Sequence, residues 1–385
     1  MRRFLRDAAI LAAAAAVMAA AVVSLGLYNP SAALGHLPGV SWILHTTYRN
    51  AVETWSGNRP TPDLADLGLV QRGAGHYGSY CADCHSTPGA KPVFIARSMV
   101  PAPPHIVDAV SDWDANELFW IVKNGVKMTG MPAWPSRVRD DEVWAVVAFL
   151  LRVPELSQAE YLDLAMGDAR DRDANGNAAG SGASAIVADC ARCHGLDGRG
   201  RGTGAAPRLD ILDEEYLYRS LEAYGSGARH SGIMQPVAYS LSPAEMRSAA
   251  RYFASLPAGP AVAAQMPDSD LVARGRAVAT AAKPGAPSCA SCHGPWPTDR
   301  ARLYPDLAGQ YEGYLLDQMN LWKQGRRGGT ALAHLMQVVV AQLEEEDLAA
   351  LAAYYASLEA PGSKDAPGAS RGDGAKAPTD PSSAR

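Results

Sequence analysis

The chain has 385 residues, enough for about two to four domains of ordinary size. Its formal net charge of −5 argues against the basic surface that nucleic acid binding requires. The 36 glycines and 27 prolines predict short, loop-rich modules and exclude one long helical bundle or one large sheet.

The N-terminus is apolar after a basic start. Three arginines among the first six residues precede an apolar run from about Ile10 to Leu27. A run of about 18 residues is near the lower limit for a membrane span and longer than a usual signal-peptide core. We expect a retained anchor with its basic end in the cytoplasm. The alternative is a signal peptide cleaved after the small residues at 19–21 or 31–33, which would leave a soluble periplasmic protein.

All six cysteines fall into one motif, C-x-x-C-H, which occurs three times with none left over. A lone C-x-x-C is also compatible with a redox disulfide or with half of a zinc site. Neither of these needs a histidine directly after the second cysteine. Covalent haem attachment does, because the two thiols bond to the haem and the histidine binds the iron. The motifs therefore predict three covalently bound haem c groups, at Cys81, Cys84 and His85; at Cys190, Cys193 and His194; and at Cys289, Cys292 and His293.

The motifs lie 109 and 99 residues apart, so each belongs to a repeated unit of about 100 residues. Two Gly-, Ala- and Pro-rich stretches separate the units, and the last 26 residues have almost no large apolar side chains. The expected organisation is an anchor helix (1–30), a juxtamembrane linker (31–64), a first module (65–160), a linker (161–182), a second module (183–257), a linker (258–269), a third module (270–359) and a disordered tail (360–385). Trp42, Ile43 and Leu44 of the juxtamembrane linker fit either an interfacial helix or packing against the first module.

Each module ends in a predicted helix whose first turn is acidic, and these helices align the modules. Counting from Met234 and from Met336, an ungapped register pairs apolar, acidic and aromatic positions of the two helices. The first module keeps this register when the count starts at Met131, and loses it when the count starts at Met128. We therefore expect Met131, Met234 and Met336 to be the second axial ligands of the three irons, and Met128 to pack at a haem edge.

Other histidines are weaker candidates for that position. His230 and His334 lie near two of the methionines, and His105 lies in the first module. A proline follows each motif, as Pro104, Pro207 or Pro305. Its carbonyl is predicted to accept a hydrogen bond from the proximal histidine and so to fix the ring.

The sequence resembles class I c-type cytochromes, repeated three times over about residues 65–358. The resemblance rests on "CADCH", "CARCHG" and "CASCHG", on the P-x-L positions, and on the downstream methionines and aromatic-bearing last helices. The third module, with "YPDLAGQYEGYLLDQMNLWKQGRR", is similar to di-haem periplasmic cytochromes, and so is the second. The first, with "KMTGMPAW", is similar to haem domains of membrane-bound cytochrome subunits. The resemblance implies an all-α fold of three small domains, in which Gly73 meets Phe149 and Gly275 meets Tyr354 where the first and last helices cross.

Three irons with both axial positions filled by protein leave no open site for a substrate. The sequence therefore predicts an electron-transfer protein, and not an enzyme, working between a periplasmic or membrane dehydrogenase and a terminal oxidase or soluble cytochrome. The alternative is a haem enzyme of the peroxidase or sulfur-compound dehydrogenase type with one open iron, for which the first module is the best candidate. No nucleic acid partner is expected.

Overall fold

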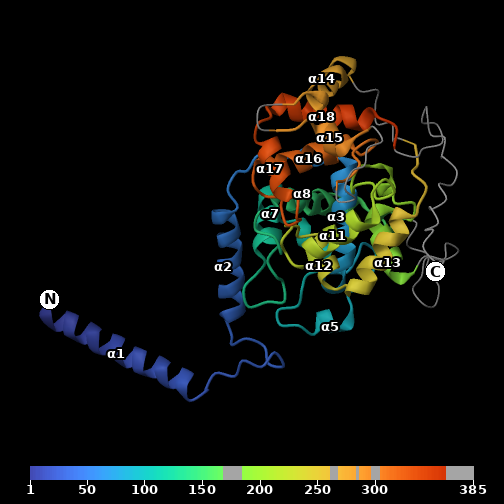
Figure 1. Cartoon of the computed structure of the whole chain (residues 1–385). Coiled ribbons are helices and arrows are strands. Elements are labelled where there is room, and N and C mark those ends of the chain that lie inside the picture. The colour runs from blue at the N-terminus through green and yellow to red at the C-terminus, as the bar shows by residue number, and fades with distance from the viewer. Residues whose placement is uncertain (168–183, 261–267, 283–285, 296–303, 361–385) are drawn as a thin grey trace, which may run out of the picture.

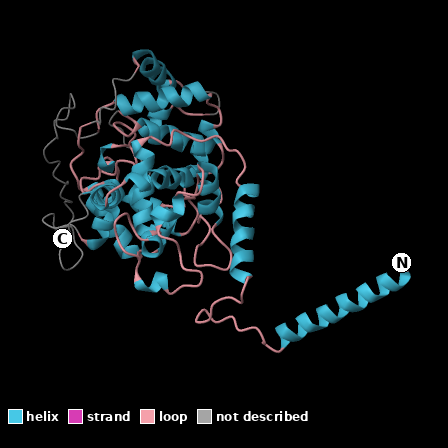
Figure 2. Ribbon diagram, turned by 180° about the vertical axis from the view of Figure 1, so that it is seen from behind, coloured by secondary structure: helices cyan, strands magenta, loops and turns pink. Residues whose placement is uncertain are grey.

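The structure is a computed structural model, and it describes residues 1–167, 184–260, 268–282, 286–295 and 304–360. The described residues form helices and loops without a β-strand, so the predicted all-α fold is confirmed (Figure 2). The predicted tail beyond residue 360 and most of both predicted linkers (168–182 and 261–267) lie outside the described residues.

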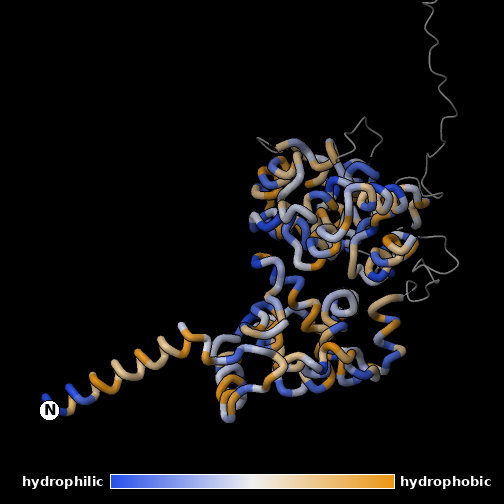
Figure 3. Tube along the Cα trace, turned by 90° about the horizontal axis from the view of Figure 1, so that it is seen from below, coloured by the Kyte–Doolittle hydropathy of each residue, from blue (hydrophilic) through white to orange (hydrophobic). Residues whose placement is uncertain are grey.

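The N-terminal helix α1 (Arg2–Ser24) projects away from the rest of the chain (Figure 1) and buries none of its residues. It is hydrophilic at its start and apolar along the rest of its length (Figure 3). Helix α2 (Val40–Trp55) follows. Val52 of α2 is fully buried and Tyr48 stacks edge-on against Trp113, which places the second half of α2 against the first module. Trp42, in its first half, stays 70% exposed.

The first module is built on a crossing of two helices. Its helices are α3 (Leu67–Tyr80), α4 (Ala82–His85), α5 (Phe94–Arg97), α6 (Ile106–Val110), α7 (Ala115–Asn124), α8 (Asp140–Arg152), the 3-10 turn η1 (Val153–Glu155) and α9 (Gln158–Met166). A methyl group added at Gly73 of α3 would lie 2.0 Å from the carbonyl oxygen of Ala145 and 2.9 Å from Cβ of Phe149 on α8. The predicted contact of Gly73 with Phe149 is therefore confirmed, and only glycine allows so close a crossing.

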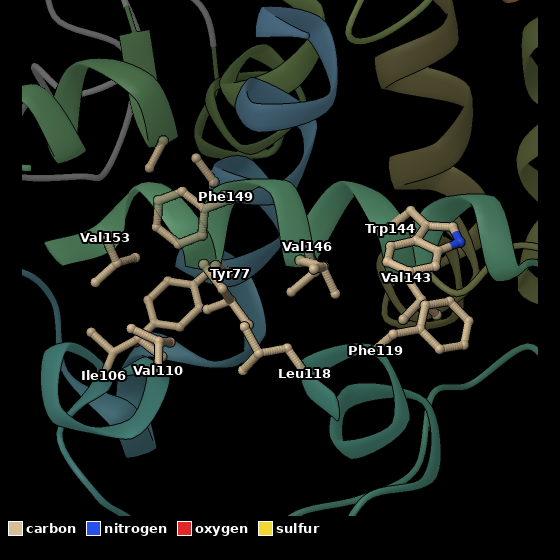
Figure 4. Close-up of a cluster of buried hydrophobic side chains, with 14 of the residues drawn as sticks. Tyr77, Ile106, Val110, Leu118, Phe119, Val143, Trp144, Val146, Phe149 and Val153 are labelled. Atoms are coloured by element: carbon tan, nitrogen blue, oxygen red, sulfur yellow. The ribbon is translucent and has the colours of Figure 1, made fainter. Parts of the chain in front are cut away.

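The core of the first module lies along this crossing. Tyr77 of α3 packs against Phe149 of α8, and α6 and α7 cover the same side of α8 with Ile106 and Leu118 (Figure 4). Helix α9 adds Tyr161, which is 3% exposed, so part of the stretch after residue 160 is helical and packed.

The helices of the second module are α10 (Ala185–His194), the 3-10 turn η3 (Gly200–Gly202), α11 (Glu214–Gly225), α12 (Met234–Tyr239) and α13 (Pro243–Ala254). Its first helix runs straight into the haem motif, and Val187 packs with Phe253 of α13. A capping box starts α13: the Ser242 hydroxyl accepts from the Glu245 amide, and the Glu245 carboxylate accepts from the Ser242 amide.

The third module repeats the crossing of the first. It comprises α14 (Ser269–Thr280), α15 (Cys289–His293), α16 (Glu312–Lys323), α17 (Ala333–Val340) and α18 (Glu345–Ser357). A methyl group at Gly275 of α14 would lie 2.0 Å from the Ala350 carbonyl oxygen and 2.6 Å from Cβ of Tyr354. The predicted contact of Gly275 with Tyr354 is thus confirmed. Helices α14 and α18 lie together at the top of Figure 1, above α3 and α8.

Polar contacts join the modules. Arg208 of the second module is fully buried and pairs with Asp210 of the same module at 2.5 Å. Its guanidinium also donates to the Gly309 carbonyl of the third module at 3.1 Å. Between the first and second, Arg72 Nε donates to the Ala205 carbonyl at 2.7 Å. A buried guanidinium needs such partners, because an unpaired charge inside a protein is strongly destabilising.

Candidate haem-binding sites

Each C-x-x-C-H motif lies on a short helical segment, α4, the end of α10 or α15, that stops at its histidine. The next residue has a positive φ in every case: 63° at Ser86, 75° at Gly195 and 78° at Gly294. One helical turn brings cysteines three residues apart to the same face, and the left-handed residue then ends the helix. Cys81, Cys84, Cys190, Cys193 and Cys292 are free thiols, the form from which cysteine bonds to a haem.

The histidines of the three C-x-x-C-H motifs are held in the same way. Nδ1 of His85 lies 2.9 Å from the Pro104 carbonyl oxygen, Nδ1 of His194 lies 3.1 Å from that of Pro207, and Nδ1 of His293 lies 2.9 Å from that of Pro305. The predicted carbonyl contact is therefore present in every module. With Nδ1–H as the donor, Nε2 keeps its lone pair and faces away from the proline, the arrangement that metal-binding histidines adopt.

The third module holds its histidine and methionine on the walls of one cavity of about 260 Å³. His293 Nε2 lies 3.5 Å from Met336 Sδ, and Cys289 and Cys292 line the same space. Helix α17 places Met336, and α15 places the other three residues. A histidine nitrogen, a thioether and two thiols around one apolar cavity are the donor set that a covalent haem with His and Met ligands would use.

The second module has a matching cavity of about 190 Å³. Cys190, Cys193, His194 and Met234 all line it, with Met234 at the start of α12. Burial lowers the pKa of His194 by more than its hydrogen bond to Pro207 raises it, so the ring is neutral and able to bind a metal. Burial also raises the pKa of Cys190 to about 12, which keeps that thiol protonated. The residues present fit the group that the sequence implies.

In the first module the two methionines occupy different environments. Met131 is half-buried in the loop between α7 and α8; its amide donates to Thr129 Oγ1 at 3.1 Å and its carbonyl accepts from the Val126 amide at 3.1 Å. Met128 is 95% exposed and has a φ of 60°. Met128 thus packs against none of the described residues. The structure gives no contact between His85 and Met131 like the one between His293 and Met336.

The spacing from methionine to last helix is the same in all three modules. Helix α8 begins at Asp140, α13 at Pro243 and α18 at Glu345, each nine residues after Met131, Met234 or Met336. The ungapped register inferred from the sequence therefore matches the helix starts. Counting from Met128 would give twelve residues in the first module.

The three remaining candidate histidines have other surroundings. Nε2 of His105 lies 3.0 Å from the Ala90 carbonyl oxygen, and its Nδ1 accepts from the Val107 amide, so both ring nitrogens are engaged at the start of α6. His230 and His334 have exposed side chains.

The sequence did not predict the residues that lie between the cavity of the second module and that of the third. Leu212, Tyr216 and Arg229 of the second module, together with Tyr314 and Gln318 of the third, line both. It also missed His76 and Tyr80 of the first module, which line the second cavity. Nothing in the pattern of the chain marks these residues, because they meet only through packing between modules.

Comparison with known proteins agrees with this geometry. Residues 68–150 match the family described as cytochrome c oxidase, cbb3-type, subunit III, and residues 179–257 and 272–359 match the family described as cytochrome c. A thiosulfate dehydrogenase electron acceptor of Stutzerimonas stutzeri is 34% identical over 46% of this chain and 82% of its own length. One of Thiomonas intermedia is 34% identical over 44% and 79%.

A cytochrome c4 of Pseudomonas aeruginosa is 32% identical over 48% of this chain and 90% of its own length. The similar proteins thus include electron carriers matched over most of their length. The repeated C-x-x-C-H helices, the carbonyl-bound histidines and these matches lead to one conclusion: the chain belongs to the class I c-type cytochromes and is a multi-haem member of that family.

Proposed function

We propose that the chain is a three-haem electron relay in which the modules at 65–160, 183–257 and 270–359 each hold one haem. The residues that would bind the three irons are His85 with Met131, His194 with Met234, and His293 with Met336. Covalently bound haem c supplies a one-electron change at its iron. The residues of the chain fix each imidazole and present each thioether, and in the second and third modules they line a cavity between the two.

The observation that carries this proposal is that all three modules hold the histidine and place the methionine in the same way. Each histidine is held by a proline carbonyl, and each methionine precedes its last helix by nine residues. With a histidine and a methionine of the chain as its ligands, each iron would exchange electrons without binding a substrate. His and Met ligation also favours a raised reduction potential, which suits an electron acceptor.

We further propose that the electrons come from a periplasmic dehydrogenase that oxidises a sulfur compound. Two of the similar proteins are named as electron acceptors of thiosulfate dehydrogenase, and each is matched over about four fifths of its length. A terminal oxidase or a soluble cytochrome would then take the electrons onward.

We propose that α1 is retained as a membrane anchor, with the haem modules on the periplasmic side. It has 23 residues and a mean hydropathy of 2.0 in its most apolar window. Exposed Trp42 follows on α2, in keeping with the aromatic residues that gather at membrane interfaces. Edman sequencing of the mature protein from washed membranes tests this: we expect the sequence to start within the first three residues. A start after residue 21 or 33 would establish cleavage.

The relay is tested on the full chain with its haems attached. We expect three covalent haems by mass, low-spin spectra for all three ferric irons, and no change when carbon monoxide is added to the reduced protein. Thiosulfate alone should not reduce the protein, whereas thiosulfate with a thiosulfate dehydrogenase should. Reduction by thiosulfate alone, or a high-spin fraction that binds carbon monoxide, would show an open iron and favour an enzyme.

A further inference from the structure

The segment that leads into Met234 is held by the first module. Ser231 Oγ donates to Glu142 Oε1 at 2.6 Å, and the Gly232 amide donates to Glu142 Oε2 at 2.5 Å. Glu142 lies in the first turn of α8, so both of its carboxylate oxygens reach out of the first module into the second. Arg139, just before α8, donates to the His230 carbonyl at 2.9 Å and pairs with Glu142 at 3.0 Å.

The Ser231 hydroxyl links Glu142 to the backbone of Met234 through hydrogen bonds. While it donates to Glu142, its oxygen accepts from the Met234 amide at 2.9 Å and from the Ile233 amide at 3.2 Å. A hydroxyl has one proton and two lone pairs, so these bonds fit together. Because α12 begins at Met234, the hydroxyl fixes the start of the helix that presents the thioether. The chain of contacts therefore runs from carboxylate to hydroxyl to Met234 backbone.

These groups are shielded from water. Glu142 is 3% exposed and Ser231 is 2% exposed. Burial raises the pKa of Glu142, opposed by Arg139 and by the bonds from Ser231 and Gly232. Hydrogen bonds between buried groups are stronger than those at a surface, and losing one partner costs more. The contact is thus suited to hold a backbone segment in one position.

A second contact from the first module reaches the same segment. A methyl group at Gly232 would lie 2.0 Å from Trp134 Nε1, so the indole lies directly against this glycine. Trp134 also packs against His76, with ring centroids 4.7 Å apart and ring planes tilted by 54°. Glu142, Arg139 and His76 line the second cavity together with His194 and Met234. The first module is therefore one wall of the second haem site.

We propose that Glu142 is a positioning residue for the second haem: through Ser231 it sets Met234 as an iron ligand, so that the first module controls ligation in the second. This inference rests on the ligand assignment of Met234 proposed above. The corresponding acidic residues of the other modules each have a partner in their own module. Glu245 closes the capping box with Ser242, and Asp347 pairs with Arg274 of α14.

The test uses the full chain with three haems and measures the methionine-to-iron charge-transfer band of the oxidised protein, with the reduction potentials as a second readout. Glu142→Ala should remove about one third of the band and shift one potential of three. Glu142→Gln, which keeps an acceptor for Ser231, should restore part of the band. Ser231→Ala should act like Glu142→Ala, and it decides the matter if Glu142→Ala does not fold.

Two further variants make the result specific. Asp141→Ala removes a neighbouring acid that also pairs with Arg139 but touches neither Ser231 nor Gly232, so it should keep the whole band. In a Met234→Ala background, Glu142→Ala should remove nothing more. If Met234→Ala removes a third of the band while Glu142→Ala and Ser231→Ala leave band and potentials unchanged, the inference fails and the ligand assignment stands. If Met234→Ala leaves the band whole, the ligand assignment itself fails.

Discussion

Met131 of the first module lies in an irregular loop, whereas Met336 of the third module lies inside the helix α17. The first loop is shaped by Gly125, with a φ of 61°, and by hydrogen bonds within the segment from Val126 to Met131. Yet both methionines precede their last helix by nine residues. The distance from the methionine to the last helix is thus the same in both modules, although the local conformation around the methionine differs.

The largest effect is expected at the glycine where the first and last helices cross, a contact that both modules share. Gly275→Ala would force its methyl group to within 2.0 Å of the Ala350 carbonyl oxygen, so α14 and α18 must separate. We expect a loss of about 3 kcal/mol in the free energy of unfolding, measured by denaturant titration. Gly73→Ala should cost a similar amount in the first module, because its methyl group would meet Ala145 at the same distance.

Gly313 on α16 provides the control for this pair. It is also a helical glycine, but a methyl group there would meet nothing within 4 Å. Gly313→Ala should leave stability unchanged or raise it by up to about 1 kcal/mol, since alanine favours a helix over glycine. Equal stability of the Gly275→Ala and Gly313→Ala proteins would contradict the close crossing.

Substitution of the two methionines should have the second-largest effect. Met131→Ala and Met336→Ala should each remove about one third of the methionine-to-iron charge-transfer band, because each would take the proposed thioether ligand from one of the three proposed irons. Met128→Ala is the matched control in the first module, since its side chain is 95% exposed. If Met128→Ala lowers the band and Met131→Ala does not, the register drawn from the last helix is wrong.

Much of this arrangement could be predicted from the sequence, because it depends on short-range patterns. The C-x-x-C-H spacing and the capping box at Ser242 act within one helical turn. The glycine at 73 and the aromatic at 149 are far apart in the chain, and they were predicted only through resemblance to a known fold. The starts of the three last helices followed from one repeated register.

The contacts between modules could not be predicted. Negative charge is favourable at a helix N-terminus, which accounts for the acidic start of α8 but not for the reach of Glu142 to Ser231. That bond joins residues 89 positions apart on two separately packed units, and no local pattern encodes such a distance. The short helices α12 and α17 around the methionines were likewise missed, because packing against the cavity decides their conformation more than helix propensity does.

The smallest expected effect concerns the loop that only the first module has. Thr129 Oγ1 donates to the Val126 carbonyl at 2.7 Å and accepts from the Met131 amide at 3.1 Å, so one hydroxyl closes the turn that presents Met131. Thr129→Val keeps the shape and removes both bonds, which should cost about 1 kcal/mol in unfolding free energy and broaden the band of one haem without abolishing it. Thr129→Ser keeps the hydroxyl and should behave like the parent protein. Because Met336 is held by α17 instead of by a side chain, a variant altered only at Thr129 should leave the third haem unchanged, and a change there would mean that the two methionine segments are not independent.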